Sequence, residues 1–134
     1  MCALRISEQY VSDADFVLYP GDCRDLLADL PDRTVRLVVT SPPCNLGKSY
    51  EDRTTLDDYI AQQTPIIEQC VRVVADDGSI CWQVGNDVDN GEIVPLDIVL
   101  FPVFASLGLH LRYPDHERDV YEGVTAARLP VIRG

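Results

Sequence analysis

The sequence lacks the cysteine pattern that holds a small secreted protein or a zinc site together. Its five cysteines are an odd number, they are scattered between Cys2 and Cys81, and no two of them form a Cys-x-x-Cys pair. Disulfide frameworks and zinc sites need paired or closely spaced cysteines, so we expect reduced thiols. The two histidines, His110 and His116, have no partners at metal-ligand spacing, and we therefore expect no metal site.

Positive charge and long apolar runs are also scarce. The chain has 11 Lys and Arg against 22 Asp and Glu, a net charge of −11. Phosphate contacts need cationic side chains, so this chain alone is not expected to hold a nucleic acid. No apolar run approaches the length of a membrane span, and the N-terminus does not have the form of a signal peptide. We therefore expect a cytoplasmic protein without a membrane segment.

The residues that are present make a globular chain. A hydrophobic share of 46% is too high for a disordered protein, and 134 residues allow one domain or part of one. The patterns divide the chain into a lead-in segment over residues 1–15, a folded region over 16–112 and a divergent tail over 113–134. The tail contains clustered charges and two prolines and shows no sustained period.

The first half of the folded region predicts a strand, a helix and a second strand. Residues 16–19 are a short apolar run, and residues 23–30 place three leucines at helical spacing before Pro31. Residues 35–39 are apolar and rich in valine, which favours a buried strand. Strand, helix and strand in fewer than 25 residues are typical of a βαβ unit with a parallel sheet.

The second half continues the alternation of helices and strands. A helix is expected from Thr55, its N-cap, to a stop at residues 76–78, with a kink or a restart at Pro65. A strand over residues 79–84, turns at 85–87 and 90–91, a helix from Pro95 to a cap at Gly108 and a strand over 109–112 follow. The whole pattern predicts an α/β fold with a mostly parallel sheet and flanking helices.

A rigid turn follows the strand over residues 35–39. Two consecutive prolines, Pro42 and Pro43, cannot continue a sheet ladder, so the chain must leave the strand at Ser41. In open α/β sheets, ligands bind just beyond the carboxyl ends of the strands. The turn therefore places a hydroxyl group and an acceptor-only backbone where a substrate can be held.

Such a turn can activate an exocyclic amine of a nucleobase, whose lone pair is normally delocalised into the ring. If Ser41 Oγ and the Pro42 carbonyl accept the two N–H hydrogens, the nitrogen becomes pyramidal and its lone pair is freed. That nitrogen could attack a methyl group held in line, with positioning as the main catalytic effect. A base inside a duplex is unreachable, so it would have to be flipped out of the stack.

Several stretches resemble the amino-DNA methyltransferases, which methylate cytosine N4 or adenine N6. They are residues 21–27, 30–32, 38–43, 76–86 and 93–96, and the resemblance covers about residues 16–112. It implies a partial Rossmann-like methyltransferase fold, S-adenosyl-L-methionine as the methyl donor and double-stranded DNA as the substrate of a completed protein. It also implies a catalytic turn made of Ser41, Pro42, Pro43 and Cys44, with Asp22 and Thr40 near the cofactor.

The resemblance favours cytosine N4 as the target, because Ser in the first position of the motif is commoner among cytosine-N4 enzymes. The alternatives are an adenine-N6 enzyme of a restriction-modification system, or an inactive truncated remnant that acts as a small interaction module. The family's Phe-x-Gly-x-Gly cofactor loop does not occur in the sequence. We therefore expect an N-terminal portion, completed by a further segment, a complementing chain or a second copy.

Cys44 departs from the family's pattern, since the fourth motif position is normally an aromatic residue that stacks on the flipped base. Cytosine-C5 methyltransferases use a Pro-Cys nucleophile, which Pro43 and Cys44 match superficially. That family also has a glycine-rich motif before the cysteine and a Glu-Asn-Val after it, and neither is present. We interpret Cys44 as a substituted platform position. In the following loop, Lys48, Tyr50 and Arg53 are candidates for DNA phosphate contacts or solvated loop residues.

Overall fold

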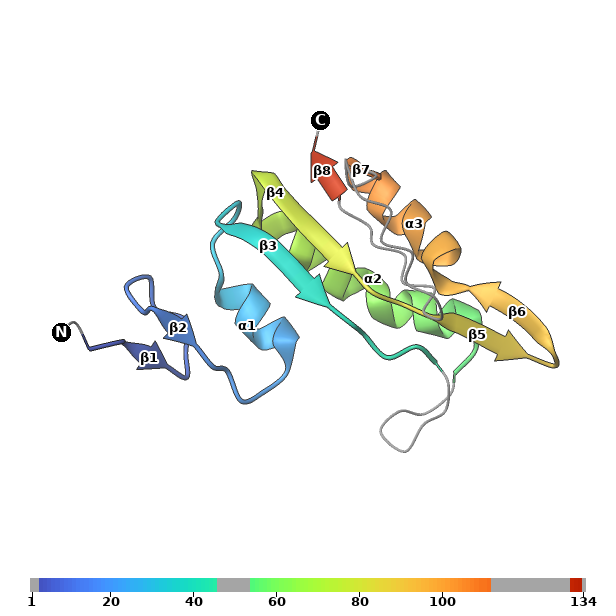
Figure 1. Cartoon of the computed structure of the whole chain (residues 1–134), viewed down its shortest axis with the longest axis horizontal. Helices are drawn as coiled ribbons and strands as arrows, with labels where there is room; N and C mark the ends of the chain where they lie inside the picture. The colour runs from blue at the N-terminus through green and yellow to red at the C-terminus, as the bar shows by residue number, and fades with distance from the viewer. Residues whose placement is uncertain (1–2, 46–53, 112–130, 134) are drawn as a thin grey trace, which may run out of the picture.

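The structure, a computed structural model, describes residues 3–45, 54–111 and 131–133. Short strands and three helices alternate along the chain (Figure 1). In order they are β1 (Ile6–Ser7), β2 (Phe16–Val17), α1 (Cys23–Asp29), β3 (Val35–Thr40), α2 (Leu56–Val73), β4 (Val74–Trp82), β5 (Asn86–Asp89), β6 (Glu92–Pro95), α3 (Leu96–Ser106), β7 (Leu109–Leu111) and β8 (Val131–Arg133).

The central unit is a parallel pair of strands, β3 and β4, joined by helix α2. Val38 lies opposite Ile80, and Thr40 lies opposite Trp82. A parallel connection needs a dozen or more residues, and the 18-residue α2 supplies them. The structure therefore contains a βαβ unit, made of β3, α2 and β4, and is a mixed α/β fold of the partial Rossmann-like kind.

The βαβ unit does not lie where the sequence pattern predicted it. Strand β2 pairs in parallel with β1, with Ile6 opposite Phe16, and not with β3. The backbone groups of β2 are engaged by β1, as in the hydrogen bond of 2.9 Å from Leu18 N–H to the Ser7 carbonyl. The prediction missed β1 because two residues are too few to show a period.

Two antiparallel pairs complete the strands that the structure describes. β5 and β6 form a hairpin around Asn90 and Gly91, whose φ angles of 49° and 83° are typical of a type I′ turn. The predicted turn at 90–91 is confirmed, whereas the predicted turn at 85–87 is wrong because Asn86 begins β5. β8 pairs with β7 and lies alongside β4, and it was not predicted.

The boundary between α2 and β4 also differs from the prediction. Thr55 is the N-cap as expected, since its Oγ1 accepts the Asp58 N–H at 3.2 Å. The helix continues past Pro65 without a restart and ends at Val73, so the predicted stop at residues 76–78 is wrong. Gly78 lies inside β4, where an added Cβ would be 2.9 Å from the Arg36 carbonyl oxygen. Glycine is needed here for the close approach of β3 and not for a helix cap.

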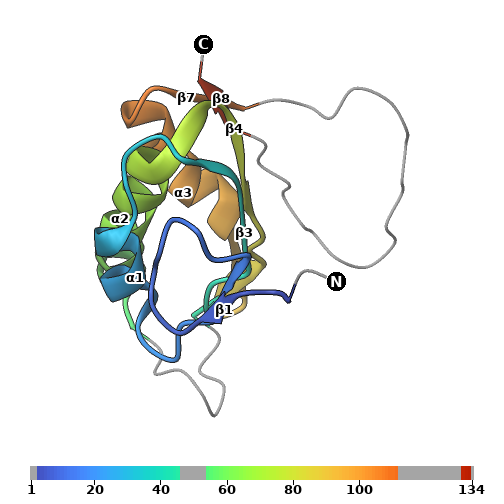
Figure 2. The ribbon, with the colours of Figure 1, turned by 90° about the vertical axis from the view of Figure 1, so that its left-hand side faces the viewer.

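The core lies between the β3–β4 pair and the helices. All three helices lie on one side of this pair (Figure 2). Trp82 is 1% exposed and Phe104 is 0% exposed, and their rings meet edge to face with centroids 5.6 Å apart. The buried hydrophobic side chains of the core come mainly from α2, β4 and α3: Tyr59, Ile67, Cys70, Val71, Val74, Ile80, Trp82, Val84, Leu96, Leu100, Phe104 and Leu109.

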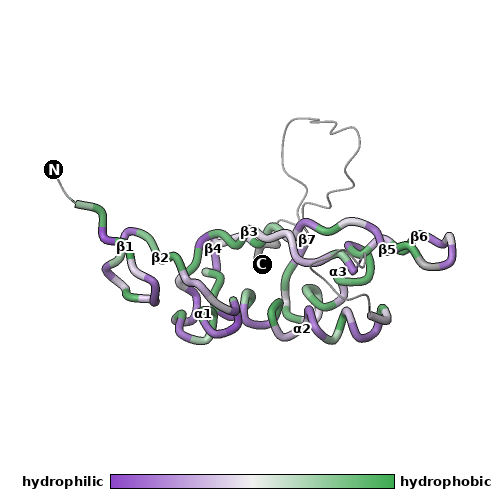
Figure 3. Tube along the Cα trace, turned by 90° about the horizontal axis from the view of Figure 1, so that it is seen from below, coloured by the Kyte–Doolittle hydropathy of each residue, from purple (hydrophilic) through white to green (hydrophobic). Residues whose placement is uncertain are grey.

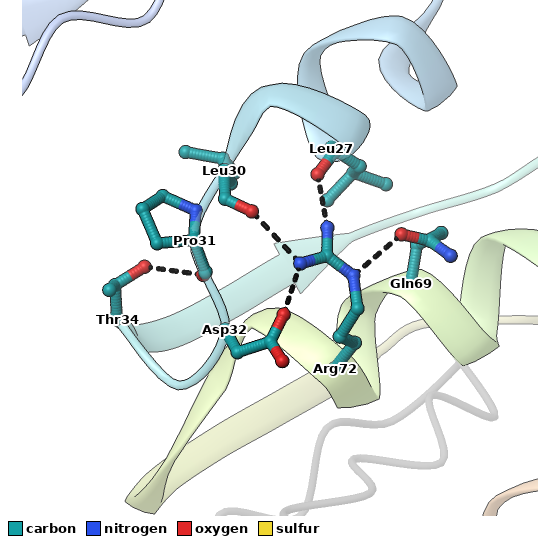
Figure 4. A network of polar contacts seen from close by, with 7 residues as sticks. All are labelled: Leu27, Leu30, Pro31, Asp32, Thr34, Gln69 and Arg72. Carbon is teal, nitrogen blue, oxygen red and sulfur yellow. Dashed lines mark hydrogen bonds and ion pairs between the residues drawn. The ribbon is translucent and has the colours of Figure 1, made fainter.

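The guanidinium group of Arg72, in α2, forms hydrogen bonds with the C-terminal end of α1 (Figure 4). Its nitrogens donate to the carbonyls of Leu27 at 2.6 Å and Leu30 at 2.9 Å, and to Asp32 Oδ1 at 2.5 Å. These carbonyls lie at the C-terminal end of α1, where a helix leaves acceptors available for other donors, and the Leu27 carbonyl also accepts the Leu30 N–H at 3.2 Å. Arg72 thus fixes the end of α1 and the loop that leads into β3.

Among the described residues, no helix is long and apolar enough to cross a membrane. The same part of the chain contains no group of three or more His, Cys, Asp or Glu that could hold a metal ion.

Candidate active site at the proline turn

The turn begins at the carboxyl end of β3. Thr40 is the last residue of the strand, and its carbonyl accepts the Gln83 N–H of the chain after β4 at 2.9 Å. The next residue, Ser41, is exposed, whereas Thr40 and Pro42 are half-buried. The structure therefore presents the Ser41 hydroxyl at the sheet edge where the sequence predicted a substrate site.

Helix α2 holds the turn through a buried tyrosine. The Tyr59 hydroxyl donates to the Pro43 carbonyl at 2.7 Å, and Tyr59 is only 3% exposed. The sequence analysis did not identify this contact. The signal was available, because a buried tyrosine hydroxyl usually has a hydrogen-bond partner.

Asn45 closes the end of the turn. Its side-chain Nδ2 donates to the Thr54 carbonyl at 2.9 Å, and its Oδ1 accepts the Thr54 N–H at 2.8 Å. Asn45 is 2% exposed and has a φ of 58°, a left-handed conformation that asparagine tolerates better than most residues. The two bonds join the described residues on either side of 46–53. The predicted phosphate-binding candidates Lys48, Tyr50 and Arg53 lie outside the described residues.

Cys44 turns toward the body of the protein. It is half-buried, packs against the hydrophobic core, and its thiol donates to the Pro42 carbonyl at 3.5 Å. That carbonyl is the one predicted to accept an N–H of the target amine. A carbonyl oxygen has two lone pairs, so it can accept a second hydrogen bond beside this weak one.

Asp22 belongs to a different element. It caps α1 by accepting the Arg24 N–H at 2.9 Å, and the Arg24 guanidinium donates to both of its carboxylate oxygens, at 2.6 Å for Nη2 to Oδ2. The side-chain hydrogen bonds from Arg24 lower the pKa of Asp22 to about 2, so the carboxylate is charged at neutral pH. Helix α1 runs roughly antiparallel to β3, so the N-terminal end of α1 and the carboxyl end of β3 point the same way (Figure 1).

The structure thus brings residues 40–44 together as one turn supported by Tyr59 and Asn45. Beneath this turn, opposite Thr40 in the register, lies Trp82, whose buried Nε1–H has no hydrogen-bond partner among the described residues.

Comparisons with known proteins identify the family of the chain. Residues 35–115 match a family of DNA methylases that act as N6 or N4 amino methyltransferases. The chain is 53% identical over 96 residues to the type II methyltransferase M.BglII of Bacillus subtilis, a match that covers 71% of this chain and 27% of that protein. It is 40% identical over 85 residues to the type II methyltransferase M.SfiI of Streptomyces fimbriatus, covering 59% and 20% of the two chains.

Solved structures show the same fold. The cytosine-N4-specific PvuII DNA methyltransferase aligns with a TM-score of 0.56 and 25% identity, over 69% of this chain and 34% of that one. Protein TTHA0409 of Thermus thermophilus, solved with S-adenosyl-L-methionine, aligns with a TM-score of 0.57 and 23% identity, over 85% and 54% of the two chains.

The chain belongs to the amino-DNA methyltransferase family. It spans about a quarter of the length of the curated relative M.BglII.

Proposed function

We propose that this chain carries the catalytic turn of a DNA methyltransferase that transfers a methyl group from S-adenosyl-L-methionine to N4 of cytosine. The proposed catalytic region is residues 16–112, and the proposed place of action is the cytoplasm. The observation that carries the proposal is the exposed Ser41 at the carboxyl end of β3, within a turn that Tyr59 fixes from below. The cytosine-N4 specificity of the PvuII relative supports the choice of base.

In the proposed mechanism the turn positions the target amine. Ser41 Oγ and the Pro42 carbonyl accept its two N–H hydrogens, so that the nitrogen lone pair points toward the methyl group. When bound, S-adenosyl-L-methionine would supply this methyl group from a sulfonium, which would leave as a neutral thioether, and the amine nitrogen would give up one proton to water. Tyr59 keeps the Pro43 peptide in place throughout.

The residues present fit the cofactor in part. Asp22 offers a charged carboxylate and Thr40 a half-buried hydroxyl group. A carboxylate has about four acceptor positions, so Asp22 can accept a further N–H or O–H donor while it remains bonded to Arg24. We propose that these two residues hold polar groups of S-adenosyl-L-methionine and that the rest of the cofactor site comes from the completing portion.

A second candidate function is a small interaction module without catalytic activity. It is favoured by Cys44, because a thiol offers little surface for stacking on a flipped base, and base stacking contributes about 1–3 kcal/mol. Adenine-N6 methylation is the alternative within the same family. The identity of the methylated base distinguishes these three functions.

The test uses a fusion protein in which this chain is linked to the part of an M.BglII-type relative that it does not match. The fusion protein is incubated with DNA and S-adenosyl-L-methionine. Mass spectrometry of the digested DNA is expected to show N4-methylcytosine. Ser41→Ala should lower kcat by about 10²–10³, in the range for loss of one hydrogen bond to the reacting group. Ser106→Ala is the matched control, since this hydroxyl donates to the Val103 carbonyl at the end of α3, and it should leave kcat unchanged. N6-methyladenine as the only product would overturn the choice of base.

The substitution Cys44→Tyr in the same fusion protein measures how much an aromatic side chain at position 44, stacked on the flipped base, adds to activity. Because stacking contributes about 1–3 kcal/mol, kcat/KM should rise by about tenfold or more. An unchanged kcat/KM would show that position 44 does not meet the base.

A further inference from the structure

Two buried polar side chains, Gln63 in α2 and Trp82 in β4, each carry an atom without a hydrogen-bond partner. Gln63 is 5% exposed and Trp82 is 1% exposed. Among the described residues, neither Gln63 Oε1 nor the indole Nε1–H of Trp82 has a hydrogen-bond partner. Buried polar groups almost always have one, because an unpaired group gives up its hydrogen bonds to water and receives nothing in return. These two atoms therefore need a partner that would satisfy them.

Contacts at the two ends of α2 fix how this helix lies along the strands. Near its start, the Tyr59 hydroxyl donates to the Pro43 carbonyl, just beyond the carboxyl end of β3. At its end, the Val73 carbonyl accepts the Thr34 N–H at 2.9 Å, just before β3 begins. Helix α2 therefore runs antiparallel to β3, and it lies along one side of the strands (Figure 3).

Gln63 and Trp82 lie at the same level along the strands. Gln63 follows Tyr59 by four residues, so it is on the same side of α2 and about 6 Å further along the helix axis. About two residues of an extended strand cover this distance, which takes Gln63 back from the level of Pro43 to that of Thr40. Trp82 lies opposite Thr40 in the register and belongs to the same buried core cluster as Tyr59.

The two unpaired atoms are also chemically complementary. The indole nitrogen is a donor only, and the amide oxygen is an acceptor. A hydrogen bond from Trp82 to Gln63 would satisfy both atoms at once. A single buried water would do the same, since it can accept from the indole and donate to the amide.

A connection at this place would complete the support of the turn. Tyr59 already joins α2 to Pro43, and the Gln83 N–H joins the chain after β4 to the Thr40 carbonyl. A bond between Gln63 and β4 would join the remaining two elements, the helix and the second strand. The turn at Ser41 would then be held from both sides at its base.

We propose that Gln63 and Trp82 are positioning residues of the catalytic turn, connected by a hydrogen bond from the indole N–H to the amide oxygen, made directly or through one buried water. This connection holds α2 at a fixed distance from the strand ends. It thereby sets where Ser41 and the Pro42 carbonyl present their acceptors to the target amine. The catalytic part of the proposal rests on the proposed function, whereas the connection itself does not depend on methyl transfer.

The first experiment observes the indole directly. Trp82 is the only tryptophan in the sequence, so the ¹⁵N–¹H NMR spectrum of the 134-residue chain contains a single indole signal. Gln63→Met keeps the length of the side chain and removes the amide, so it should shift this signal and speed its exchange with solvent at least about tenfold. Gln62→Met is the matched control, because Gln62 is the exposed neighbour, and it should leave the signal unchanged.

The same spectra identify the form of the connection and its effect on the turn. A nuclear Overhauser effect from the indole proton to a long-lived water indicates the bridged form, and one to the Gln63 amide protons indicates the direct form. The absence of both would overturn the proposal. The backbone amide signals of Ser41 and Cys44 should shift in Gln63→Met and not in Gln62→Met, which measures the positioning of the turn without any reaction.

The second experiment measures methyl transfer by the fusion protein. Gln63→Met should lower kcat by about tenfold with little change in KM, whereas Gln62→Met should change neither. In a Trp82→Phe background, which lacks the indole N–H, Gln63→Met should have little further effect on kcat. Independent losses from the two substitutions would contradict a connection between the residues. If Trp82→Phe unfolds, the indole signal of the Gln63 variant still decides whether the connection exists.

The outcomes separate this proposal from the proposed function. An indole signal that is identical in the wild type and in Gln63→Met would overturn the connection. A shifted indole signal with unchanged turn signals and unchanged kcat would overturn the positioning role. A fusion protein that transfers no methyl group, while Gln63→Met shifts both the indole and the turn signals, would contradict the proposed function and support the positioning of the turn by Gln63 and Trp82.

Discussion

The β3–β4 pair has an inner face that packs on the helices and an outer face that carries Leu37 and Val39, and the two faces differ sharply in exposure. Val38 and Val39 are neighbours and chemically identical, yet Val38 packs against the core while Val39 is 70% exposed. The strand sequence alone does not distinguish them. What distinguishes them is which face the helices cover: Val38 lies on the covered face, whereas Val39 lies on the face that these helices leave exposed.

The largest loss of stability is expected when a large side chain of the inner face is removed. Trp82→Ala removes a side chain that is 1% exposed and packs on Phe104, so it should lower the free energy of unfolding by about 3–5 kcal/mol. Val39→Ala on the outer face should change it by less than about 0.5 kcal/mol. Urea denaturation of both variants measures the difference. Similar losses would mean that the outer face is also packed in solution.

High pH should destabilise the folded protein because the thiol of Cys70 is buried in the core. Burial raises the pKa of this thiol from an ordinary 9.0 to about 11, so the folded protein holds the proton more tightly than the unfolded chain. The stabilisation is complete below pH 9 and is lost as the pH rises toward 11, by up to about 3 kcal/mol. Unfolding free energies across this range should fall more steeply for the wild type than for Cys70→Val. Parallel pH curves would contradict the buried position of the thiol.

Loss of the Arg72 hydrogen bonds should weaken the packing of α1 against α2. Arg72→Met keeps much of the apolar stem but leaves the Leu27 and Leu30 carbonyls without these donors, at a cost of about 1–3 kcal/mol. Hydrogen exchange should increase in α1 more than in α3. Arg33→Met is the control, since the ion pair of Arg33 with Asp76 is exposed and should contribute little. Equal effects of the two substitutions would show that the network does not hold α1.

A smaller loss of stability is expected where α2 meets the catalytic turn. Tyr59→Phe removes only the hydroxyl that donates to the Pro43 carbonyl, at a cost of about 0.5–1.5 kcal/mol. In a protein joined to the rest of a relative, it should lower kcat more than it changes KM, because the turn positions the amine. A loss of stability with unchanged kcat would make the contact purely structural.

Much of the fold could be predicted from local signals. The N-caps at Asp22 and Thr55, the Asn90–Gly91 turn and the left-handed Gly108 each follow from the preferences of one or two residues. Strand partners could not be predicted in the same way. The pairing of β2 with β1 and of β7 with β8 depends on contacts between distant segments, and strands of two or three residues have no measurable period.

For the candidate site, the sequence predicted where the strand ends and not what supports the turn. The two prolines identify the turn at Ser41 because they exclude a continued strand, and β3 does end at Thr40. The contacts from Tyr59 and Asn45 depend on how α2 packs against the turn, which local sequence does not specify. The proposed roles of Asp22, Thr40 and Cys44 stay predictions.

Methyl transfer by the completed protein tests the central proposal most directly. The joined chain is incubated with DNA and S-adenosyl-L-methionine that carries a labelled methyl group, and the label in each base is measured for the wild type and for Ser41→Ala. We expect label on cytosine N4 from the wild type and about 10²–10³ less from the variant. Equal transfer by both proteins, or no transfer by a wild-type complex that is correctly assembled, would contradict the assignment of Ser41 and its turn as the catalytic centre.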